Sequence, residues 1–231
     1  VLRSAADALR LRGQLAAARC VTVLGGGFIG LEVAATARGL GKAVQVLEAA
    51  PRLLQRAVSA ELADHVLATH RAAGVELRLG VRVDGFEVDG GHLQSLQVDG
   101  QAQLVDLLLL GIGAVPQTAL AEAAGLACGN GILVDESMRS SDPAILAIGD
   151  VANFPGREGA PRCRLESVQN ANDQAKTALA TLLGTPEPYR AVPWFWSEQG
   201  PMRLQMAGLM PSGGTSVRRP GAAPASFSLL H

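Results

Sequence analysis

Hydrophobic positions change their spacing along the chain, from strand-like to helix-like and back. Residues 21–24 form a short apolar run rich in β-branched side chains, which is typical of a buried strand. Apolar residues at helical spacing follow over 31–40, and a second apolar run covers 43–47. This succession of strand, helix and strand predicts a parallel α/β unit.

The same patterns predict the remaining elements. Further helices are expected as a lead-in segment at 1–19, behind Ser59 as N-cap at 59–74, and behind Ser167 at 168–183. Further strands are expected at 75–79, 81–88, 93–98, 104–110, 132–135, 145–150 and across 193–206. The strand at 104–110 is nearly continuous in apolar residues, so we expect it to be buried on both faces. Residues 212–225 are rich in glycine, proline and serine, and we expect them to be mobile.

The turn between the first strand and the first helix of this unit has the sequence Gly-Gly-Gly-Phe-Ile-Gly over residues 25–30. Gly25 permits the tight turn, Gly27 lets backbone amides approach a pyrophosphate, and Gly30 lets the helix pack closely on the sheet. Glu48 ends the second strand, where its carboxylate can bind both ribose hydroxyls and repel a 2′-phosphate. Strand, turn, helix and terminal acid together predict a site for NADH rather than NADPH.

Two later turns are candidates for cofactor contacts. Gly111-Ile112-Gly113 follows a strand of the same domain, at the edge of the sheet where nucleotides bind. An ordinary strand-to-helix turn is the alternative interpretation. Asp150 ends the apolar stretch at 145–150, and its carboxylate could bind a chain of sugar-like hydroxyls or cap the next turn.

Composition excludes several classes of function. Of the 231 residues, 48% are hydrophobic and the net charge is −1, which describes a globular protein without an electrostatic attraction to nucleic acid or anionic membrane. No apolar run is long enough to span a bilayer. The cysteines are far apart and form no metal or redox pair, so we expect free thiols in a cytoplasmic protein. The histidines are interpreted as surface or helix residues, not ligands. They are His65, His70, His92 and His231.

Several motifs, taken together, resemble those of the FAD-dependent NADH:ferredoxin reductases, members of the pyridine nucleotide-disulfide oxidoreductase superfamily. The motifs are Gly-Gly-Gly-Phe-Ile-Gly-Leu-Glu at 25–32, Gly-Ile-Gly at 111–113, Ala-Ile-Gly-Asp-Val-Ala at 147–152, Glu-Ser at 166–167 and Pro-Trp-Phe-Trp-Ser at 193–197. The last is the most specific, because related disulfide reductases lack it. The resemblance implies a flavoprotein that passes electrons from NADH through FAD to a [2Fe–2S] ferredoxin of an oxygenase system.

The resemblance also implies roles for individual residues. NADH would contact Gly25, Gly27, Phe28, Ile29, Gly30, Glu48, Gly111, Ile112 and Gly113, with Glu32 beside the nicotinamide as the catalytic-site residue. FAD would contact Gly149, Asp150, Ser167 and Val168, where Val168 stands at a position that is tryptophan in some relatives. Side-chain acid–base or nucleophilic chemistry is not required, because the cofactors supply the reactive atoms.

The implied fold class is α/β: a Rossmann-like domain with an antiparallel excursion, part of a second, FAD-binding α/β domain, and the start of a small α+β domain. The expected boundaries are 1–19 for the lead-in helix, 20–115 for the NADH-binding domain, 116–188 for the later part of the FAD-binding domain and 189–231 for an incomplete C-terminal domain. Because this last domain resembles a reductase dimerisation domain, a homodimer is one of the expected assemblies. The family carries a separate FAD-binding glycine motif ahead of this region. We therefore expect a truncated chain that binds NADH and holds FAD weakly or not at all.

Alternatives remain at this stage. A disulfide or nitrite reductase of the same superfamily would have its cysteine pair in the part of the protein expected ahead of residue 1. A non-catalytic NADH-binding module would have lost the flavin. Trp194 and Trp196 are interpreted either as core aromatics of a small β domain, which is slightly favoured, or as residues facing the ferredoxin.

Overall fold

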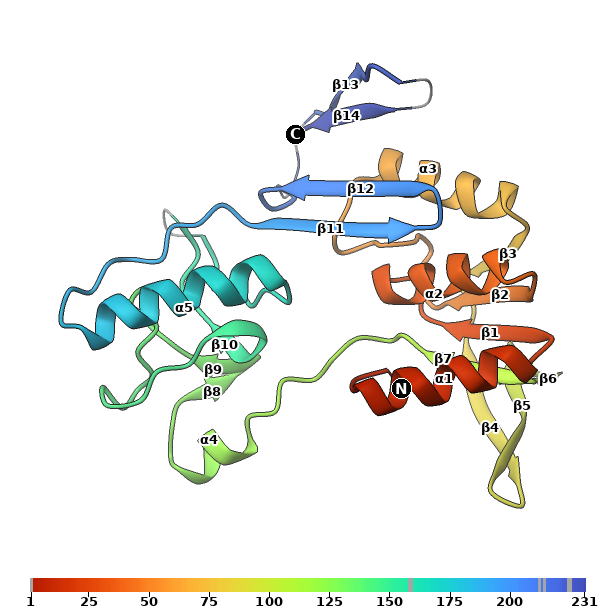
Figure 1. The fold of residues 1–231 in the computed structure, drawn as a ribbon, viewed down its shortest axis with the longest axis horizontal. Coiled ribbons are helices and arrows are strands. Elements are labelled where there is room, and N and C mark those ends of the chain that lie inside the picture. The colour runs from red at the N-terminus through yellow and green to blue at the C-terminus, as the bar shows by residue number, and fades with distance from the viewer. Residues whose placement is uncertain (1, 158–159, 212, 214, 224–225) are drawn as a thin grey trace. The chain divides into compact units, whose positions relative to one another are not determined.

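A computed structural model describes residues 2–157, 160–211, 213, 215–223 and 226–231 (Figure 1). The chain forms two compact units. The first unit contains Val1–Gly113, Ser197–Leu204 and Leu209–His231, and the second contains Ala114–Trp196 and Gln205–Gly208. The α/β class expected from the sequence is confirmed, with a parallel sheet in the first unit and several antiparallel pairs.

The first unit is built on a four-stranded parallel sheet of order β3-β2-β1-β7. Its strands are β1 (Cys20–Leu24), β2 (Ala43–Glu48), β3 (Val75–Leu79) and β7 (Leu107–Leu110). Val21, Val23 and Val46 are fully buried, as the apolar runs predict. Because β1 and β7 are neighbours, the turns that leave their carboxyl ends adjoin.

Three helices accompany this sheet. They are α1 (Ala5–Ala17), α2 (Phe28–Gly39) and α3 (Ala60–Ala72). Helix α2 packs on β1 and β2, and α3 packs on β3. The predicted N-cap Ser59 is confirmed, since its hydroxyl accepts a hydrogen bond from the Leu62 amide. In the lead-in helix, Ser4 and Asp7 form a reciprocal capping box.

An antiparallel sheet of order β4-β5-β6 is inserted before β7. Its strands are β4 (Val83–Asp89), β5 (His92–Val98) and β6 (Gln101–Leu104), with the expected turn between the first two. Leu96 and Val98 pack with Leu47 and Val81 in one buried cluster, which joins this insertion to the parallel sheet.

The expected single strand at 104–110, buried on both faces, is wrong. Leu104 ends β6 and is exposed, whereas β7 begins at Leu107 and forms the edge of the parallel sheet. Asp106 lies between the strands and accepts hydrogen bonds from the amides of Arg19 and Cys20. These bonds hold the pKa of Asp106 below its ordinary value. A charged residue inside the apolar run therefore marks the change of sheet.

The second unit contains a small sheet of order β10-β9-β8 and one long helix. Its elements are α4 (Ala119–Ala123), β8 (Cys128–Gly129), β9 (Gly131–Leu133), a 3₁₀ turn η1 (Gly149–Val151), β10 (Ala152–Asn153) and α5 (Val168–Leu182). Met138, Phe154 and Ala178 lie at the centre of its core. Helix α5 is confirmed with Ser167 as N-cap, whose side chain accepts from the Asn170 amide.

The strand expected at 145–150 is wrong. Only Leu146 forms a β-bridge, to Arg139, and the stretch then turns into η1. Gly149 has φ of +74°, and its amide donates to the Gln174 side chain on α5 at 2.7 Å. A backbone in this conformation leaves the strand, so Asp150 sits in a turn.

Two hairpins complete the chain. The first joins β11 (Trp194–Gln199) to β12 (Met202–Ala207), and the second joins β13 (Val217–Pro220) to β14 (Phe227–Leu230). The 212–225 segment, which is expected to be mobile, includes β13, and this strand pairs with β14 along its length. Residues 212, 214, 224 and 225 lie outside the described residues. Within the described chain, no helix combines the length and apolar composition needed to cross a bilayer.

Candidate functional site

The glycine-rich turn after β1 is shaped by two contacts that admit no side chain. Gly25 has φ of +108°, and a Cβ on it would lie 2.4 Å from the carbonyl oxygen of Gly111. A Cβ on Gly30 would lie 2.1 Å from the carbonyl oxygen of Gly25. Both glycines are therefore needed for the fold of the turn itself.

Gly27 differs, because the space beside it is open. A Cβ there would come no closer than 4.0 Å to the carbonyl oxygen of Gly111. Gly27 is the N-cap of α2 and forms no side-chain cap, so the helix begins without a side-chain acceptor. Ile29 in the first turn is 60% exposed. Open space at an uncapped helix N-terminus is the geometry that binds a pyrophosphate.

The turn after β7 lies against the same glycines. The amide of Gly111 donates to the carbonyl oxygen of Leu24, at the end of β1, at 2.8 Å. A Cβ on Gly111 would lie 3.3 Å from the Cα of Gly30. Beyond it, Ile112 is exposed and Gly113 has φ of +108°. The structure thus brings 25–30 and 111–113 together at the carboxyl ends of neighbouring parallel strands.

Glu48 reaches this turn from the end of β2. Its Oε2 accepts from the Gly26 amide at 2.5 Å, and its Oε1 accepts from the Ala50 amide at 2.7 Å. The carboxylate is half-buried and holds two loops in place. The sequence motif placed Glu48 beside the turn, but it gave no sign of these two backbone bonds.

Glu32, on α2, is the start of a chain of hydrogen bonds that sequence analysis missed. The Ser197 hydroxyl donates to Glu32 Oε1 at 2.6 Å, and the Gln199 side-chain amide donates to the Ser197 oxygen at 3.1 Å. Gln199 Oε1 then meets His70 Nε2 at 2.8 Å. Glu32, His70 and Ser197 are too far apart in the sequence for any local pattern to reveal that they are joined. The only available signal is that Ser197 and Gln199 alternate as polar residues on one face of a strand.

His70 is on a helix, as expected, but it is buried, with 3% exposure. Burial lowers its pKa, and the hydrogen bond to Gln199 opposes this effect only in part. The unfolded chain therefore takes up this proton first as the pH falls below the ordinary value of 6.5. We expect stability to be highest above that pH and to fall between it and the lower native pKa, by up to about 1.4 kcal/mol per pH unit.

Urea unfolding of the wild type and His70→Gln between about pH 5 and about pH 7.5 measures this contribution. The variant should lose the acid-side slope that His70 contributes. His92→Gln, at the exposed start of β5, is the control and should keep the wild-type slope. Equal slopes in His70→Gln and the wild type would contradict the assignment.

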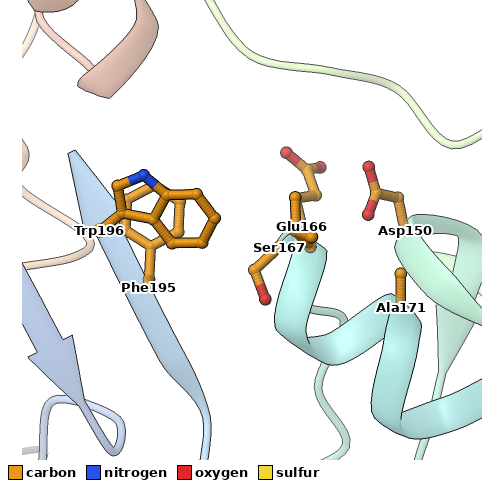
Figure 2. A pocket seen from close by; sticks show the side chains of 7 residues that line it. Asp150, Glu166, Ser167, Ala171, Phe195 and Trp196 are labelled. Atoms are coloured by element: carbon orange, nitrogen blue, oxygen red, sulfur yellow. The ribbon is translucent and has the colours of Figure 1, made fainter. Parts of the chain in front are cut away.

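The second unit carries an open pocket of about 350 Å³, lined by Asp150, Glu166, Ser167, Val168, Ala171, Phe195 and Trp196. Figure 2 shows the carboxylates of Asp150 and Glu166 on one side and the rings of Phe195 and Trp196 on the other. The predicted residues Asp150, Ser167 and Val168 are thus brought together, with Gly149 just behind Asp150. Apolar walls with a few converging polar groups are typical of a small-molecule site.

A half-buried arginine that sequence analysis missed organises the polar side of this pocket. Arg164 donates to Glu166 Oε1 at 2.6 Å and to the carbonyl oxygen of Asp150 at 2.8 Å. Behind the pocket, Gln174 binds the Gly149 amide through Oε1, while its buried Nε2 has no partner among the described residues. These groups fix the turn that presents Asp150.

Trp194 and Trp196 are stacked, with ring centroids 5.0 Å apart. Their exposures of 40% and 39% contradict the favoured interpretation as core aromatics. The strand is nevertheless anchored, because the Trp194 amide donates to Gln169 on α5. An anchored, exposed pair of indoles at the rim of a pocket is typical of a contact surface.

The cysteine thiols and the side chains that could bind a metal ion are the remaining candidates for reactive groups. Cys20, Cys128 and Cys163 are free thiols. Burial raises the pKa of Cys20 and of Cys163, so both are protonated at neutral pH. Among the described residues, no group of acidic, histidine and cysteine side chains has the arrangement needed to hold a metal ion.

Comparison with known proteins identifies the family. The family model of the pyridine nucleotide-disulphide oxidoreductases matches residues 1–175. The chain belongs to this family. A second model, for a reductase C-terminal domain, matches residues 194–231 and therefore includes the tryptophan motif. The superfamily resemblance carried by the motifs is thereby confirmed.

Among curated proteins, the chain is 46% identical to terpredoxin reductase of a Pseudomonas species, covering 97% of this chain and 56% of the relative. It is 40% identical to putidaredoxin reductase of Pseudomonas putida, covering 100% of this chain and 55% of the relative. The chain spans about half the length of the curated relatives it matches.

Solved structures agree with this placement. The ferredoxin reductase for the CYP199A2 system from Rhodopseudomonas palustris has a TM-score of 0.93 at 41% identity, covering 99% of this chain and 57% of that one. The covalent putidaredoxin reductase–putidaredoxin complex has a TM-score of 0.92 at 39% identity, and the match covers 99% of this chain and 55% of that one. The family's fold is thus shared across nearly the whole chain.

Proposed function

We propose that this chain serves an NADH-dependent ferredoxin reductase, in which electrons pass from NADH through FAD to a [2Fe–2S] ferredoxin. The observation that carries the proposal is the open space at Gly27, where the turns after β1 and β7 meet. The names of the similar proteins, which include a reductase in complex with putidaredoxin, support a ferredoxin as the electron acceptor. The free thiols support a cytoplasmic location.

In this proposal the first unit binds NADH. Its pyrophosphate would lie at the N-terminus of α2 beside Gly27, with Phe28, Ile29 and the 111–113 turn around the nucleotide. Glu48 would accept hydrogen bonds from the adenosine ribose while keeping its bonds to the backbone. Glu32 would lie beside the nicotinamide. The boundary at Gly113 supports an NADH domain that ends close to residue 115.

The pocket of the second unit would hold the flavin end of FAD. Its mixture of aromatic walls and polar groups fits a flat ring system with a polar edge. Asp150 would bind the hydroxyls of the chain that leaves the ring, and the N-terminus of α5 at Ser167 and Val168 would face the ring's polar edge. Bound FAD would supply the hydride acceptor for NADH and the one-electron donor for the ferredoxin, and these protein residues would supply orientation and charge.

The test supplies FAD and a [2Fe–2S] ferredoxin to the protein and follows NADH oxidation together with ferredoxin reduction. The proposal predicts that NADH oxidation requires FAD and that the ferredoxin is reduced in step. NADH oxidation that proceeds with a disulfide substrate but leaves the ferredoxin oxidised would contradict it and would favour the disulfide reductase alternative.

Trp196→Ala tests the role of the exposed indole pair. We expect ferredoxin reduction to slow by at least about tenfold, because interface tryptophans contribute strongly to binding. NADH-dependent reduction of a small dye should fall by much less than ferredoxin reduction at equal flavin loading, although Trp196 also lines the pocket proposed for the flavin.

Phe86→Ala is the matched control, because Phe86 is an exposed aromatic residue on β4, in the first unit. It should leave both rates unchanged. An equal loss of both activities in Trp196→Ala, together with a lower melting temperature, would instead support a structural role for Trp196.

A further inference from the structure

A continuous polar chain runs through the first unit from α3 to α2 by way of β11. It consists of His70, Gln199, Ser197 and Glu32, joined by contacts of 2.8, 3.1 and 2.6 Å. Ser197 is fully buried, Gln199 is 2% exposed and His70 is 3% exposed. Only Glu32, at the end of the chain, is half-buried rather than buried.

The donors of this chain all point in one direction. Glu32 as a carboxylate only accepts, so the Ser197 hydroxyl donates to it. Ser197 then accepts from the Gln199 amide nitrogen, which leaves the Gln199 oxygen facing His70. An amide oxygen only accepts, so Nε2 of His70 carries the proton. Bonds aligned in this way polarise one another and concentrate their effect on the terminal acceptor.

The side chains that β11 turns inward are unusual for a strand packed inside a fold. Ser197 and Gln199 stand at alternate positions and face the helices, where apolar residues are the rule. The β11–β12 turn lies beside α2 as well, since a Cβ on Gly200 would be in ordinary van der Waals contact with the Cβ of Ala35, at 3.7 Å. An apolar strand would bury the same area without the cost of desolvating polar groups.

We propose that Ser197, Gln199 and His70 are positioning residues that hold the Glu32 carboxylate in place for the nicotinamide of NADH. Oε1 of Glu32 is engaged by Ser197, which leaves Oε2 for a donor group on the nucleotide. The C-terminal segment thus completes the nucleotide site formed by residues 1–113. This inference rests on the proposed placement of Glu32 beside the nicotinamide.

Binding of NADH and of ADP-ribose separates this role from a general effect on the fold. ADP-ribose carries the same adenosine and pyrophosphate but lacks the nicotinamide. In Ser197→Ala, NADH affinity should fall about fivefold, because one hydrogen bond to the carboxylate is lost. ADP-ribose affinity should stay within about twofold of the wild type, since its contacts lie at the glycine turn.

Three further variants sharpen the measurement. Ser95→Ala is the matched control, because Ser95 is also buried and donates to a carboxylate, that of Glu87, at 2.7 Å on the antiparallel sheet. It should change neither affinity. Ser197→Thr retains the hydroxyl and should restore NADH binding. In the Glu32→Ala background, which removes the acceptor of the Ser197 hydroxyl, Ser197→Ala should cause little additional loss, because the coupling passes through that carboxylate.

Each outcome decides the matter. Equal weakening of NADH and ADP-ribose binding in Ser197→Ala would show that the polar chain only supports the fold, as would a full effect of Ser197→Ala in the Glu32→Ala background. Unchanged NADH affinity in well-folded Ser197→Ala would also overturn the inference. If the wild type binds NADH no more tightly than ADP-ribose, the proposed position of Glu32 beside the nicotinamide is wrong. If it binds neither ligand, the proposed function fails as well.

Discussion

Replacing Gly27 by valine is expected to weaken NADH binding at least about a hundredfold, or ~2.7 kcal/mol, while the protein stays folded. The space beside Gly27 is open to 4.0 Å, and its φ of −81° suits any residue. The new side chain would therefore enter the space proposed for the pyrophosphate, and its Cβ would not clash with the protein. Loss of a favourable N-cap should lower the melting temperature by only about 2–4 °C.

Gly85→Val is the matched control, because a Cβ on Gly85 in β4 meets only the Gln97 side chain at 3.9 Å. It should bind NADH as the wild type does. Gly30→Val, by contrast, should lose binding together with the fold, since its Cβ has no room. Titration of NADH with a parallel thermal melt measures all three variants. Near-normal NADH affinity in Gly27→Val would contradict the placement of the pyrophosphate.

Glu48→Arg is expected to shift the preference between NADH and NADPH by about two orders of magnitude. NADH loses the acceptor for its ribose hydroxyls, while a guanidinium can bind the 2′-phosphate of NADPH. The structure adds a second expectation. The amides of Gly26 and Ala50 lose their acceptor, so the free energy of unfolding should fall by about 1–3 kcal/mol.

Affinities for both nucleotides and urea unfolding together test this prediction. Glu122→Arg, on the exposed side of the second unit, makes the same change in net charge and should alter neither selectivity nor, by more than about 0.5 kcal/mol, stability. Unchanged NADH affinity in Glu48→Arg would remove Glu48 from the nucleotide site and leave it only the role of joining two loops.

The sequence was sufficient for those parts of the site that depend on local backbone geometry. A strand followed by Gly25, Gly27 and Gly30, with Glu48 at the next strand end, specifies the turn because the close approach of Gly30 to Gly25 and the bond from the Gly26 amide to Glu48 lie within one supersecondary unit. The N-cap role of Ser167 at α5 was predictable for the same reason.

Other features depended on contacts that the sequence does not show. The polar chain from Glu32 to His70 joins segments far apart in sequence, and no periodicity reports such a meeting. Asp106 within an apolar run was read as part of one strand, although its bonds to the amides of Arg19 and Cys20 separate two sheets. The exposure of Trp196 likewise depends on packing and could not be inferred from its type.

The central claim is that NADH binds where the turns after β1 and β7 meet. Backbone amide NMR spectra of the isotope-labelled protein, recorded during a titration with NADH, test it directly. We expect the largest shifts at Gly25, Gly27, Gly30 and Gly113, while Gly85 stays unchanged. Shifts confined to the pocket at Asp150, or a spectrum that does not respond to NADH, would contradict this placement of NADH.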